Sequence, residues 1–491
     1  MIELNRTKEN KWILQKNISS GKLFETFLEA IDSQNNSTDK NNLKDYLSKK
    51  DVYKGRSEEG SSNTMGVRLS QACFYMFGYK KFNKFFPSPM TKLFLGSNND
   101  IKHSENMLVN LFSMQFPSPY SNTSSNFEIY IGRLFVQLLL DKRLDEKLYI
   151  DECIYFLMFL ENINEEYYSE LVDSILEYRS LSYDEKWNLF KEVPNYNEVF
   201  ANATHEMNYY FIKIFREFGV FDVIGDASHN DGKIFEFIHG NYSAIRKDAY
   251  APRKKYSGYI KLNENIKNQA IILIKENPLF ERVSTQDTYL SKDEWIRELY
   301  EFAPLKYIET IMERNDDNIE VIENIKSMVY HSKYGSRDGK SFENSLLPIF
   351  EMFRENRSVT LISGSGDTDL LCVMDNKDDE LYKINVDAKT SRTSTNSITS
   401  TRIRDHLDKN GSEYCIIVSP RFAKGVKRDI KDFNIVVVEA ETLAQYCLNS
   451  CLSSEDKLAD FSMINDLIKS NMGNDITVPL QELIDKEFNM A

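Results

Sequence analysis

Several features that would narrow the class of this 491-residue protein are missing from its sequence. No run of eighteen apolar residues occurs, which excludes a helix long and apolar enough to cross a membrane. Residues 1–12 lack the apolar core of a secretory signal peptide. The six cysteines are scattered and form no Cys-x-x-Cys pair, so a zinc finger is not expected. These absences predict a cytoplasmic protein with reduced, buried thiols and no membrane association.

An excess of basic charge is also missing. The formal net charge is −14, which argues against a protein that coats nucleic acid indiscriminately. A specific binder stays possible, because a local basic cleft can oppose an acidic surface. The hydrophobic content of 41% and the charged content of 28% are those of a soluble globular protein. The chain is too long for one ordinary core, so several domains are expected.

The most informative stretch is 363–392. Residues 370–374 form an unbroken apolar run, as in a strand buried on both faces, and a polar turn follows at 375–379. The next strand alternates, so that Asp387 and Lys389 share one face. Asp369 opens the neighbouring strand. If the two strands pair, two carboxylates and one ammonium converge.

Such a group of side chains suits phosphodiester hydrolysis. Mg²⁺ prefers carboxylate oxygens and keeps several waters, and a lysine beside it can orient the attacking water or help to deprotonate it. An isolated Asp-x-Lys is more often a solvated strand edge. The interpretation as an active site therefore depends on the ensemble, which adds an acid at the start of the preceding strand and an upstream helix that carries Glu343.

These residues resemble the PD-(D/E)xK nuclease core, and in particular the cleavage domain of FokI-like type IIS restriction endonucleases. The matching segments are the glycine-rich turn 364–366, the acid and apolar residues 369–371, and Val-Asp-Ala-Lys at 386–389. Thr368 stands where the family usually has proline, and Asp367 is a rival for the first acid. The likeness continues through 413–419 and 433–438 and covers about the last third of the chain.

The resemblance implies a metal site and a catalytic lysine. Asp369, Asp387 and the carbonyl of Ala388 would bind Mg²⁺, and Lys389 would position the water. Glu343 lies in the first turn of an amphipathic helix that is expected to begin with Ser341 as its N-cap. Its carboxylate either completes the metal site, as in many PD-(D/E)xK enzymes, or only complements the helix dipole.

A second, shorter resemblance concerns the N-terminal region. Gln-Phe-Pro-Ser-Pro at 115–119, followed by the largely apolar run 129–140, is similar to AlwI-like type IIS endonucleases and their nicking relatives. A proline-capped loop between two core helices explains the same residues equally well.

The middle of the chain has the element order of a winged helix. A helix is expected over 204–218, with Thr204 as its N-cap and Gly219 at its end, followed by strands at 220–224 and 233–238. His205 is expected to be a surface residue of that helix and not a metal ligand.

Two basic segments are candidates for contacts to DNA phosphates, although a solvated loop is the commoner explanation of a charge cluster. The first segment interleaves tyrosines with basic residues over 246–261, and the second follows the nuclease motif in a Ser/Thr-rich stretch. The predicted DNA-binding residues are Arg246, Lys247, Arg253, Lys254, Lys255, Lys261, Arg392, Arg402 and Arg404.

The predicted fold class is multidomain, with a mostly α-helical recognition region, a winged-helix-like subdomain and a C-terminal α/β PD-(D/E)xK domain with a central mixed sheet. The expected boundaries are 1–200 for the helical recognition domain, 201–285 for the winged-helix-like part, 286–335 for a helical connector, with its linker at 331–340, and 336–491 for the nuclease domain.

The predicted function is that of a Mg²⁺-dependent, sequence-specific endonuclease of the type IIS class, or a nicking relative, acting on double-stranded DNA. A transient homodimer or a second cleavage subunit is expected for cutting both strands. Two alternatives stay open: a DNA-binding or interaction protein with an inactive nuclease fold, and a structure-specific repair nuclease.

Overall fold

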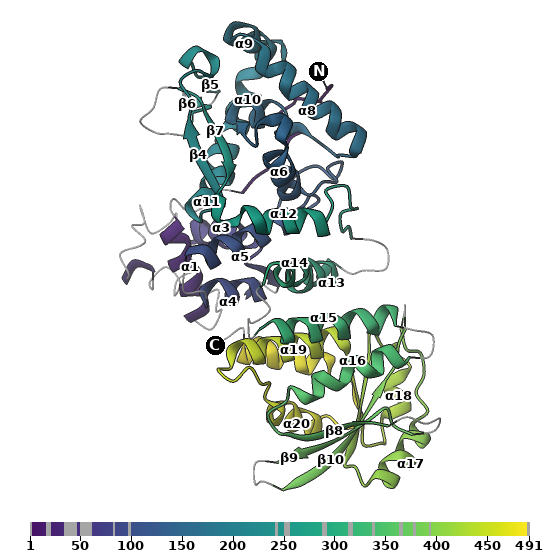
Figure 1. Cartoon of the computed structure of the whole chain (residues 1–491). Helices are drawn as coiled ribbons and strands as arrows, with labels where there is room; N and C mark the ends of the chain where they lie inside the picture. Colours follow the sequence, from purple (N-terminus) through teal and green to yellow (C-terminus); the bar gives the residue numbers. More distant parts are fainter. Residues whose placement is uncertain are drawn as a thin grey trace. The chain divides into compact units, whose positions relative to one another are not determined.

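The computed structural model of the chain consists of two compact units, unit 1 (Met1–Ile311) and unit 2 (Met312–Ala491) (Figure 1). The structure describes all residues except 1, 16–20, 34–46, 50–60, 82–83, 97–99, 241–243, 250–255, 287–291, 313–317, 336–338, 363–366, 377–379, 392–393 and 489–491. Among the residues that the structure describes, no helix has the length and apolarity that a membrane crossing requires.

The division between the units differs from the predicted linker at 331–340. Helix α15 (Ile319–Tyr334) lies in unit 2, where it packs against α16 (Lys340–Glu351) and α19 (Ala440–Ser453). The main-chain amide of Ser391 also donates to the carbonyl of Ser332 at 3.3 Å. The segment between Tyr334 and Lys340 therefore connects α15 to α16 within unit 2.

Unit 1 is mainly helical, as predicted. Its α6 is apolar almost all round and is correspondingly buried against α5. The close approach requires Gly132, because a Cβ atom there would lie 1.7 Å from the carbonyl oxygen of Leu111. The helices of unit 1 are α1 (Gly21–Ser33), α3 (Ser61–Phe74), α4 (Pro89–Leu95), α5 (Asp100–Ser113), α6 (Ile131–Leu140), α7 (Ile150–Tyr155), α8 (Glu165–Ser180), α9 (Tyr183–Glu192), α10 (Tyr196–Glu206), α11 (Lys213–Glu217), α12 (Lys267–Glu276), α13 (Lys292–Arg297) and α14 (Ala303–Ile311).

The helix expected to start at Thr204 begins earlier. Helix α10 starts at Tyr196 and continues through a π-helical turn, Met207–Ile212, into α11. Thr204 is fully buried inside this helical run, so the prediction of an N-cap there is wrong. Gly219, with φ +72°, follows the end of α11 as predicted.

Some strands of unit 1 pair over long separations in sequence, and the winged-helix-like arrangement of this part stays a prediction. Strand β4 (Phe221–Gly225) pairs with β7 (Gly258–Leu262), which also pairs with β3 (Leu148–Tyr149). Strand β5 (Glu236–His239) pairs with β6 (Ala244–Lys247). Strand β4 therefore pairs with a strand more than thirty residues away and not with the strand predicted at 233–238. A separate two-stranded sheet joins β1 (Gly78–Lys81) to β2 (Lys84–Pro87).

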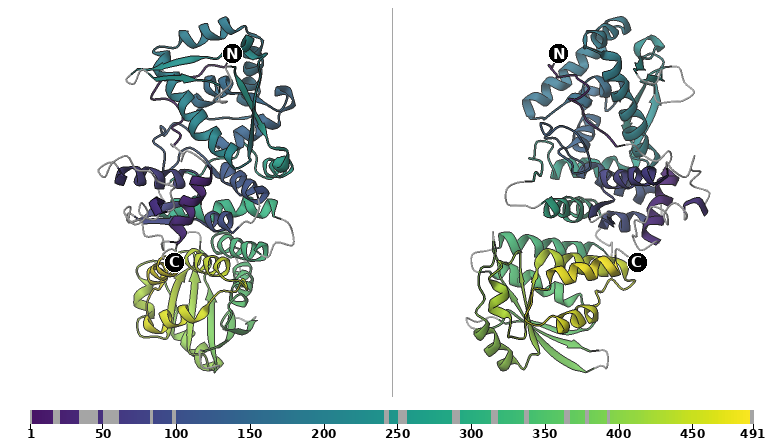
Figure 2. Two further views of the ribbon diagram at one scale, coloured as in Figure 1. Left: turned by 90° about the vertical axis from the view of Figure 1, so that its left-hand side faces the viewer. Right: turned by 180° about the vertical axis from the view of Figure 1, so that it is seen from behind.

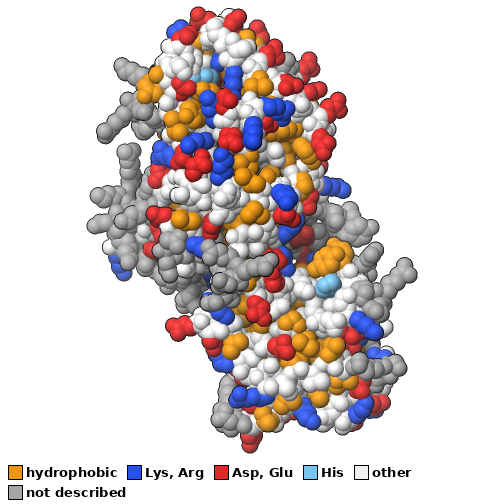
Figure 3. Space-filling view, in the orientation of Figure 1, with side chains coloured by type: hydrophobic (Ala, Val, Ile, Leu, Met, Phe, Trp, Pro, Cys, Tyr) orange, Lys and Arg blue, Asp and Glu red, His pale blue; other side chains and the backbone are white. Residues whose placement is uncertain are grey.

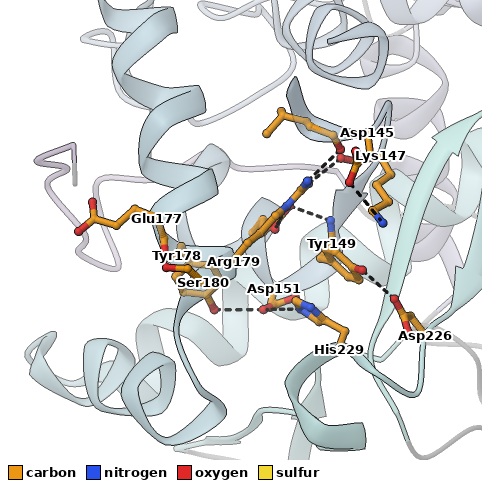
Figure 4. A network of polar contacts seen from close by, with 12 residues as sticks. Asp145, Lys147, Tyr149, Asp151, Glu177, Tyr178, Arg179, Ser180, Asp226 and His229 are labelled. Atoms are coloured by element: carbon orange, nitrogen blue, oxygen red, sulfur yellow. Dashed lines mark hydrogen bonds and ion pairs between the residues drawn. The ribbon is translucent and has the colours of Figure 1, made fainter. Parts of the chain in front are cut away.

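A buried polar network ties the elements of unit 1 together (Figure 4). The carboxylate of Asp151 on α7 contacts the His229 ring at 2.9 Å and accepts from the Tyr178 hydroxyl at 3.1 Å. The Tyr149 ring stacks on His229 with a centroid distance of 3.5 Å. Burial would raise the pKa of Asp151, but the charge of His229 and the surrounding donors lower it to about 2. The network therefore holds a charged carboxylate inside the unit.

Unit 2 contains a mixed five-stranded sheet, which confirms the predicted α/β character. The strand order is β12-β11-β10-β9-β8, with β8, β9 and β10 antiparallel and β10, β11 and β12 parallel. Strands β11 and β12 are largely apolar and buried because helices cover both faces of the sheet, whereas β10 alternates polar and apolar residues (Figures 1 and 2). The strands are β8 (Asn356–Leu361), β9 (Leu370–Asp375), β10 (Leu381–Ala388), β11 (Tyr414–Ser419) and β12 (Ile435–Glu439).

The two faces of this sheet have different helical layers. Helices α17 (Ser400–Asn410) and α18 (Val426–Ile430) bury Ile403 and Val426 against Ile417 of β11. On the other face α16 packs on the antiparallel strands and α19 on β12. The remaining helices of unit 2 are α20 (Phe461–Ser470) and α21 (Thr477–Glu487).

Helix α16 carries the predicted buried stripe of Phe342, Leu346, Ile349 and Phe350. It begins at Lys340, after Gly339 in the left-handed conformation, so Ser341 is not its N-cap. The predicted position of Glu343 in the first turn is confirmed.

Candidate active site

The ends of two neighbouring strands bring the predicted carboxylates together. Strands β9 and β10 are antiparallel, with Leu370 opposite Val386, so the next residues, Asp369 and Asp387, stand opposite each other. The main-chain amide of Ala388 donates to Asp369 Oδ2 at 2.6 Å. The pairing that the sequence pattern predicted is thus the one the structure has.

Thr368 fixes the second carboxylate. Its hydroxyl lies 3.2 Å from the carbonyl of Val386 and 3.1 Å from Asp387 Oδ1. The residue is buried, and so is Asp387, whose side chain is 2% exposed. The sequence analysis treated Thr368 only as a departure from the proline of the family. The signal that was available is its hydroxyl, which can bond a carboxylate across the strand pair where proline cannot.

Lys389 completes the group at the end of β10. Its Nζ lies 3.1 Å from Asp387 Oδ2 and 3.1 Å from the carbonyl of Ala388. Its main-chain amide donates to Val418 of the parallel strand β11 at 2.9 Å. The side chain is 30% exposed, so the ammonium reaches solvent beside a buried carboxylate.

The electrostatics of the group are those of crowded negative charge. Burial, and then the charge of Asp387, raise the pKa of Asp369 to about 6, against the opposing effects of Lys389 and the Ala388 amide. Burial alone would lower the pKa of Lys389, but Asp387 and Asp369 raise it above its ordinary value. The lysine is therefore held as a cation.

The two remaining acids of the motif have different positions. Asp367 is paired with Lys409 of α17, which lowers the pKa of Asp367 and engages this carboxylate with α17. This pairing favours Asp369 as the first acid. Glu343 is close enough for its charge to contribute to the raised pKa of Asp369. A role for Glu343 beside the carboxylate pair stays a prediction.

The donor set fits a hard divalent cation. Among the described residues no three His, Cys, Asp or Glu side chains are grouped as a metal site. Asp369 and Asp387 instead offer two carboxylates, and the Ala388 carbonyl and Asp387 lie within 3.1 Å of the same Lys389 ammonium. All three groups are oxygen donors of the kind that Mg²⁺ prefers. A bound cation would relieve the repulsion that raises the pKa of Asp369.

The described members of the predicted DNA-binding set are divided between unit 1 and unit 2. Lys247 is exposed on β6 and pairs with Glu236 at 2.5 Å, and Lys261 on β7 lies 3.9 Å from Glu264. Arg246 is partly buried. Arg402 and Arg404 are exposed on α17, and the described contacts do not join them to the carboxylate pair. Arg253, Lys254, Lys255 and Arg392 lie outside the described residues.

Comparison with known proteins gives the family. The family model of the N-terminal domain of the type II restriction endonuclease HgaI matches residues 7–276, which is more than half of the chain and lies within unit 1. The chain belongs to the HgaI family of restriction endonucleases. The type II restriction enzyme HgaI of Avibacterium volantium is 28% identical to it over 490 residues, which cover 97% of both chains.

Two solved structures are also similar to this HgaI-family chain. They are the restriction endonuclease FokI and FokI bound to DNA, at 10% and 9% identity. The alignments cover 95% and 96% of this chain and 100% of each FokI chain, with a TM-score of 0.27 in both cases. The prediction of a type IIS restriction enzyme, a site-specific DNA endonuclease, is confirmed by the family match and by the similarity to HgaI along the whole chain.

The raised pKa of Asp369 predicts that this carboxyl of the candidate site destabilises the HgaI-family fold when no cation is bound. A carboxyl with a pKa of about 6 contributes full stability below pH 4 and loses it as the pH rises through 6. The Asp369→Asn variant has no carboxyl at this position to ionise, so its stability is not lowered in this way as the pH rises. When unfolding by urea is measured with a chelator present, the free energy of unfolding of the variant should be about 2 kcal/mol larger than that of the wild type at pH 8. The two values should be equal at pH 4.

The exposed Asp408 on α17 offers a matched control, since Asp408→Asn should change the free energy of unfolding little at either pH. An Asp369→Asn protein that is less stable than the wild type at both pH values would show that the site does not crowd its charges as described.

Proposed function

We propose that this chain is a Mg²⁺-dependent type IIS enzyme whose unit 1 recognises a site on double-stranded DNA and whose unit 2 hydrolyses the phosphodiester bonds at a distance. The observation that carries the proposal is the convergence of Asp369, Asp387 and Lys389 at the end of β9 and β10. This convergence on a mixed sheet supports the proposal of a PD-(D/E)xK site in unit 2.

Asp369, Asp387 and the carbonyl of Ala388 would hold the Mg²⁺ ion. When bound, such an ion offsets the negative charge that develops on the phosphate and lowers the pKa of a coordinated water. Thr368 helps to orient the Asp387 carboxylate, because its hydroxyl lies 3.1 Å from Asp387 Oδ1 and can donate its hydrogen there. The fixed carboxylate supports a defined position for the ion relative to the scissile phosphate.

Lys389 acts as a cation in this mechanism. Its raised pKa favours a protonated ammonium, which donates hydrogen bonds to the attacking water or to a phosphate oxygen. A role as the base that deprotonates the water would require the lysine to lose its proton, and Asp387 and Asp369 oppose that. The proposed function of Lys389 is therefore to position and to neutralise charge.

Unit 1 carries the proposed recognition function, together with the basic residues predicted from the sequence. The exposed Lys247 and the partly exposed Lys261 are proposed to contact phosphates, as are the exposed Arg402 and Arg404 on α17 of unit 2. Arg246, Arg253, Lys254, Lys255 and Arg392 belong to the same proposal. Phosphate contacts fix the register of the protein on the duplex, and base contacts specify the site.

An inactive nuclease fold and a structure-specific repair nuclease are the alternatives. The retained carboxylate pair, lysine and orienting threonine support an active enzyme. Membership of a restriction endonuclease family supports the recognition of a sequence rather than of a fork or flap. We also propose that the enzyme works in the cytoplasm, where its free, buried cysteines fit a reducing environment.

Cleavage of plasmid DNA tests this function. The purified protein should cut only with Mg²⁺ present, and sequencing of the ends should give one recognition sequence with the cuts at a fixed offset from it. Ends without a common neighbouring sequence would reject site-specific recognition. Cleavage that persists in chelator would reject the metal-dependent mechanism.

The single carboxylate pair predicts an assembly step in double-strand cutting. One such site cuts one strand at a time, so a second cleavage domain, from another copy or another subunit, is needed for the opposite strand. On a plasmid with one site, nicked DNA should accumulate at low protein concentration and linear DNA should rise steeply with concentration. Linearisation at a rate independent of concentration, by a protein that stays monomeric on DNA in sedimentation, would contradict this.

A further inference from the structure

The two-stranded sheet of β5 and β6 presents an apolar pair on its outer face. Ile238 and Ile245 stand directly opposite each other and are 54% and 52% exposed. Glu236 and Lys247, the other residues of this face, also oppose each other and form an ion pair. Large aliphatic side chains opposed in this way gain little from the fold, because more than half of each remains in water.

The inner face of the same ribbon is firmly held. Phe237 is fully buried, and its ring lies 5.2 Å from that of Phe190 and 5.5 Å from those of Trp187 and Phe200. The main-chain amide of Ile238 donates to Asn197 Oδ1 of α10 at 3.0 Å. The helices α9 and α10 therefore form a platform beneath the ribbon.

The open end of the ribbon, where β5 begins and β6 ends, is anchored by buried polar groups. After β6, the Asp248 carboxylate accepts from the Phe235 amide at 2.9 Å and from the Ser257 hydroxyl at 3.1 Å. Asn208 donates to the carbonyl of Lys247 at 3.0 Å. Before β5, His229 contacts Asp151, the carboxylate at the centre of the network in Figure 4. Side chains on a ribbon fixed in this way lose little conformational freedom when they bind.

The chemistry around the ribbon fits a nucleic acid. Its last strand begins the basic segment 246–261, in which six basic residues face a single acid, Asp248, and that acid is buried under the ribbon. On the face of unit 1 seen in Figure 3, hydrophobic side chains lie among Lys, Arg, Asp and Glu side chains. Basic residues beside exposed apolar ones suit a duplex, whose phosphates bind the former and whose base edges bind the latter.

We propose that the β5–β6 ribbon enters the major groove of the recognition site and that Ile238 and Ile245 read thymine methyl groups there. A two-stranded ribbon fits the width of the major groove, and the C5-methyl of thymine is the apolar group that this groove displays. The proposal rests on the recognition function proposed for unit 1. It assigns specificity to the apolar pair and phosphate contact to the neighbouring basic residues.

The test compares the full-length wild type with Ile238→Ala/Ile245→Ala by selection from a randomised duplex library, in Ca²⁺ to prevent cutting. The double variant should lose its preference at one or two base pairs by about tenfold. The salt dependence of its binding should not change, because no phosphate contact is removed. Where the lost preference is for thymine, uracil in that position should weaken the wild type about tenfold and leave the double variant unaffected.

The adjacent residues Ile271 and Ile272 of α12 provide a matched control, since they are 45% and 44% exposed in the same unit. Ile271→Ala/Ile272→Ala should select the wild-type site. Equal thermal unfolding of both double variants excludes a folding defect.

The outcomes distinguish a failure of the role proposed for the ribbon from a failure of the recognition function proposed for unit 1. A wild type without any sequence preference would reject the recognition function itself. A wild type that selects a site, together with an Ile238→Ala/Ile245→Ala protein that selects the same site equally strongly, would reject only the role of the ribbon. Uniform weakening on all sequences, or lost self-association with unchanged selection, would also overturn it, since the pair would then serve a phosphate contact or a protein interface.

Discussion

Asp387→Ala is expected to cut its site at least about a thousandfold more slowly than the wild type, while still binding that site. The variant loses a fixed, buried carboxylate that would hold the cation, and about 4 kcal/mol of lost transition-state stabilisation corresponds to this factor. Binding should equal or exceed that of the wild type, because a negative charge beside the scissile phosphate is removed. Single-turnover cleavage in Mg²⁺ and equilibrium binding in Ca²⁺ measure the two effects on one preparation.

Asp408→Ala is the control, since it removes an exposed carboxylate of α17 in the same unit and should cut like the wild type. Lys389→Ala should also stop cutting, while its affinity for the cation is largely retained. If Asp387→Ala and Lys389→Ala cut at the rate of the control, the active site lies elsewhere.

Separating the two units should separate recognition from cutting. The fragment 1–311 should bind the recognition sequence selectively without any cleavage, and the fragment 312–491 should nick DNA weakly without sequence preference. The reason is that the proposed catalytic residues Asp369, Asp387 and Lys389 lie in unit 2. The residues matched by the HgaI family model lie wholly in unit 1. Gel-shift competition and plasmid nicking check the two halves.

A fragment with a different N-terminal boundary provides the control for this experiment. A fragment 336–491 lacks α15, whose packing against α16 and α19 includes an ion pair between Lys333 and Glu441, so it should unfold more readily than 312–491. A folded fragment 1–311 that binds all sequences equally would contradict the division of function.

The meeting of Asp369, Asp387 and Lys389 was predictable because it depends on sequence patterns that are local. Alternation along 382–389 places Asp387 and Lys389 on one face, and the turn between two short strands leaves few ways to pair them. The mixed sheet was implied by the resemblance to the PD-(D/E)xK core, which continues through 413–419 and 433–438, and β11 and β12 form there.

The elements that the sequence analysis missed depend on distant partners. Thr204 is typical of an N-cap, yet the helix continues past it because its residues bury against the core of unit 1. Strand β4 pairs with β7, more than thirty residues away, and no local pattern shows that choice. The segment 331–340 has the composition of a linker, but a contact from Ser391 holds it within unit 2. The role of Thr368 became visible only with the register of β9 and β10.

The most direct test of the account is to locate the bound cation. Fe²⁺ in place of Mg²⁺, with ascorbate and peroxide, generates hydroxyl radicals that cut the main chain next to the ion. The account predicts cuts in the wild-type protein close to Asp369 and to Asp387, and their loss in Asp387→Ala. Cuts confined to unit 1, or cuts in unit 2 that Asp387→Ala leaves unchanged, would contradict the assignment of catalysis to this pair of carboxylates.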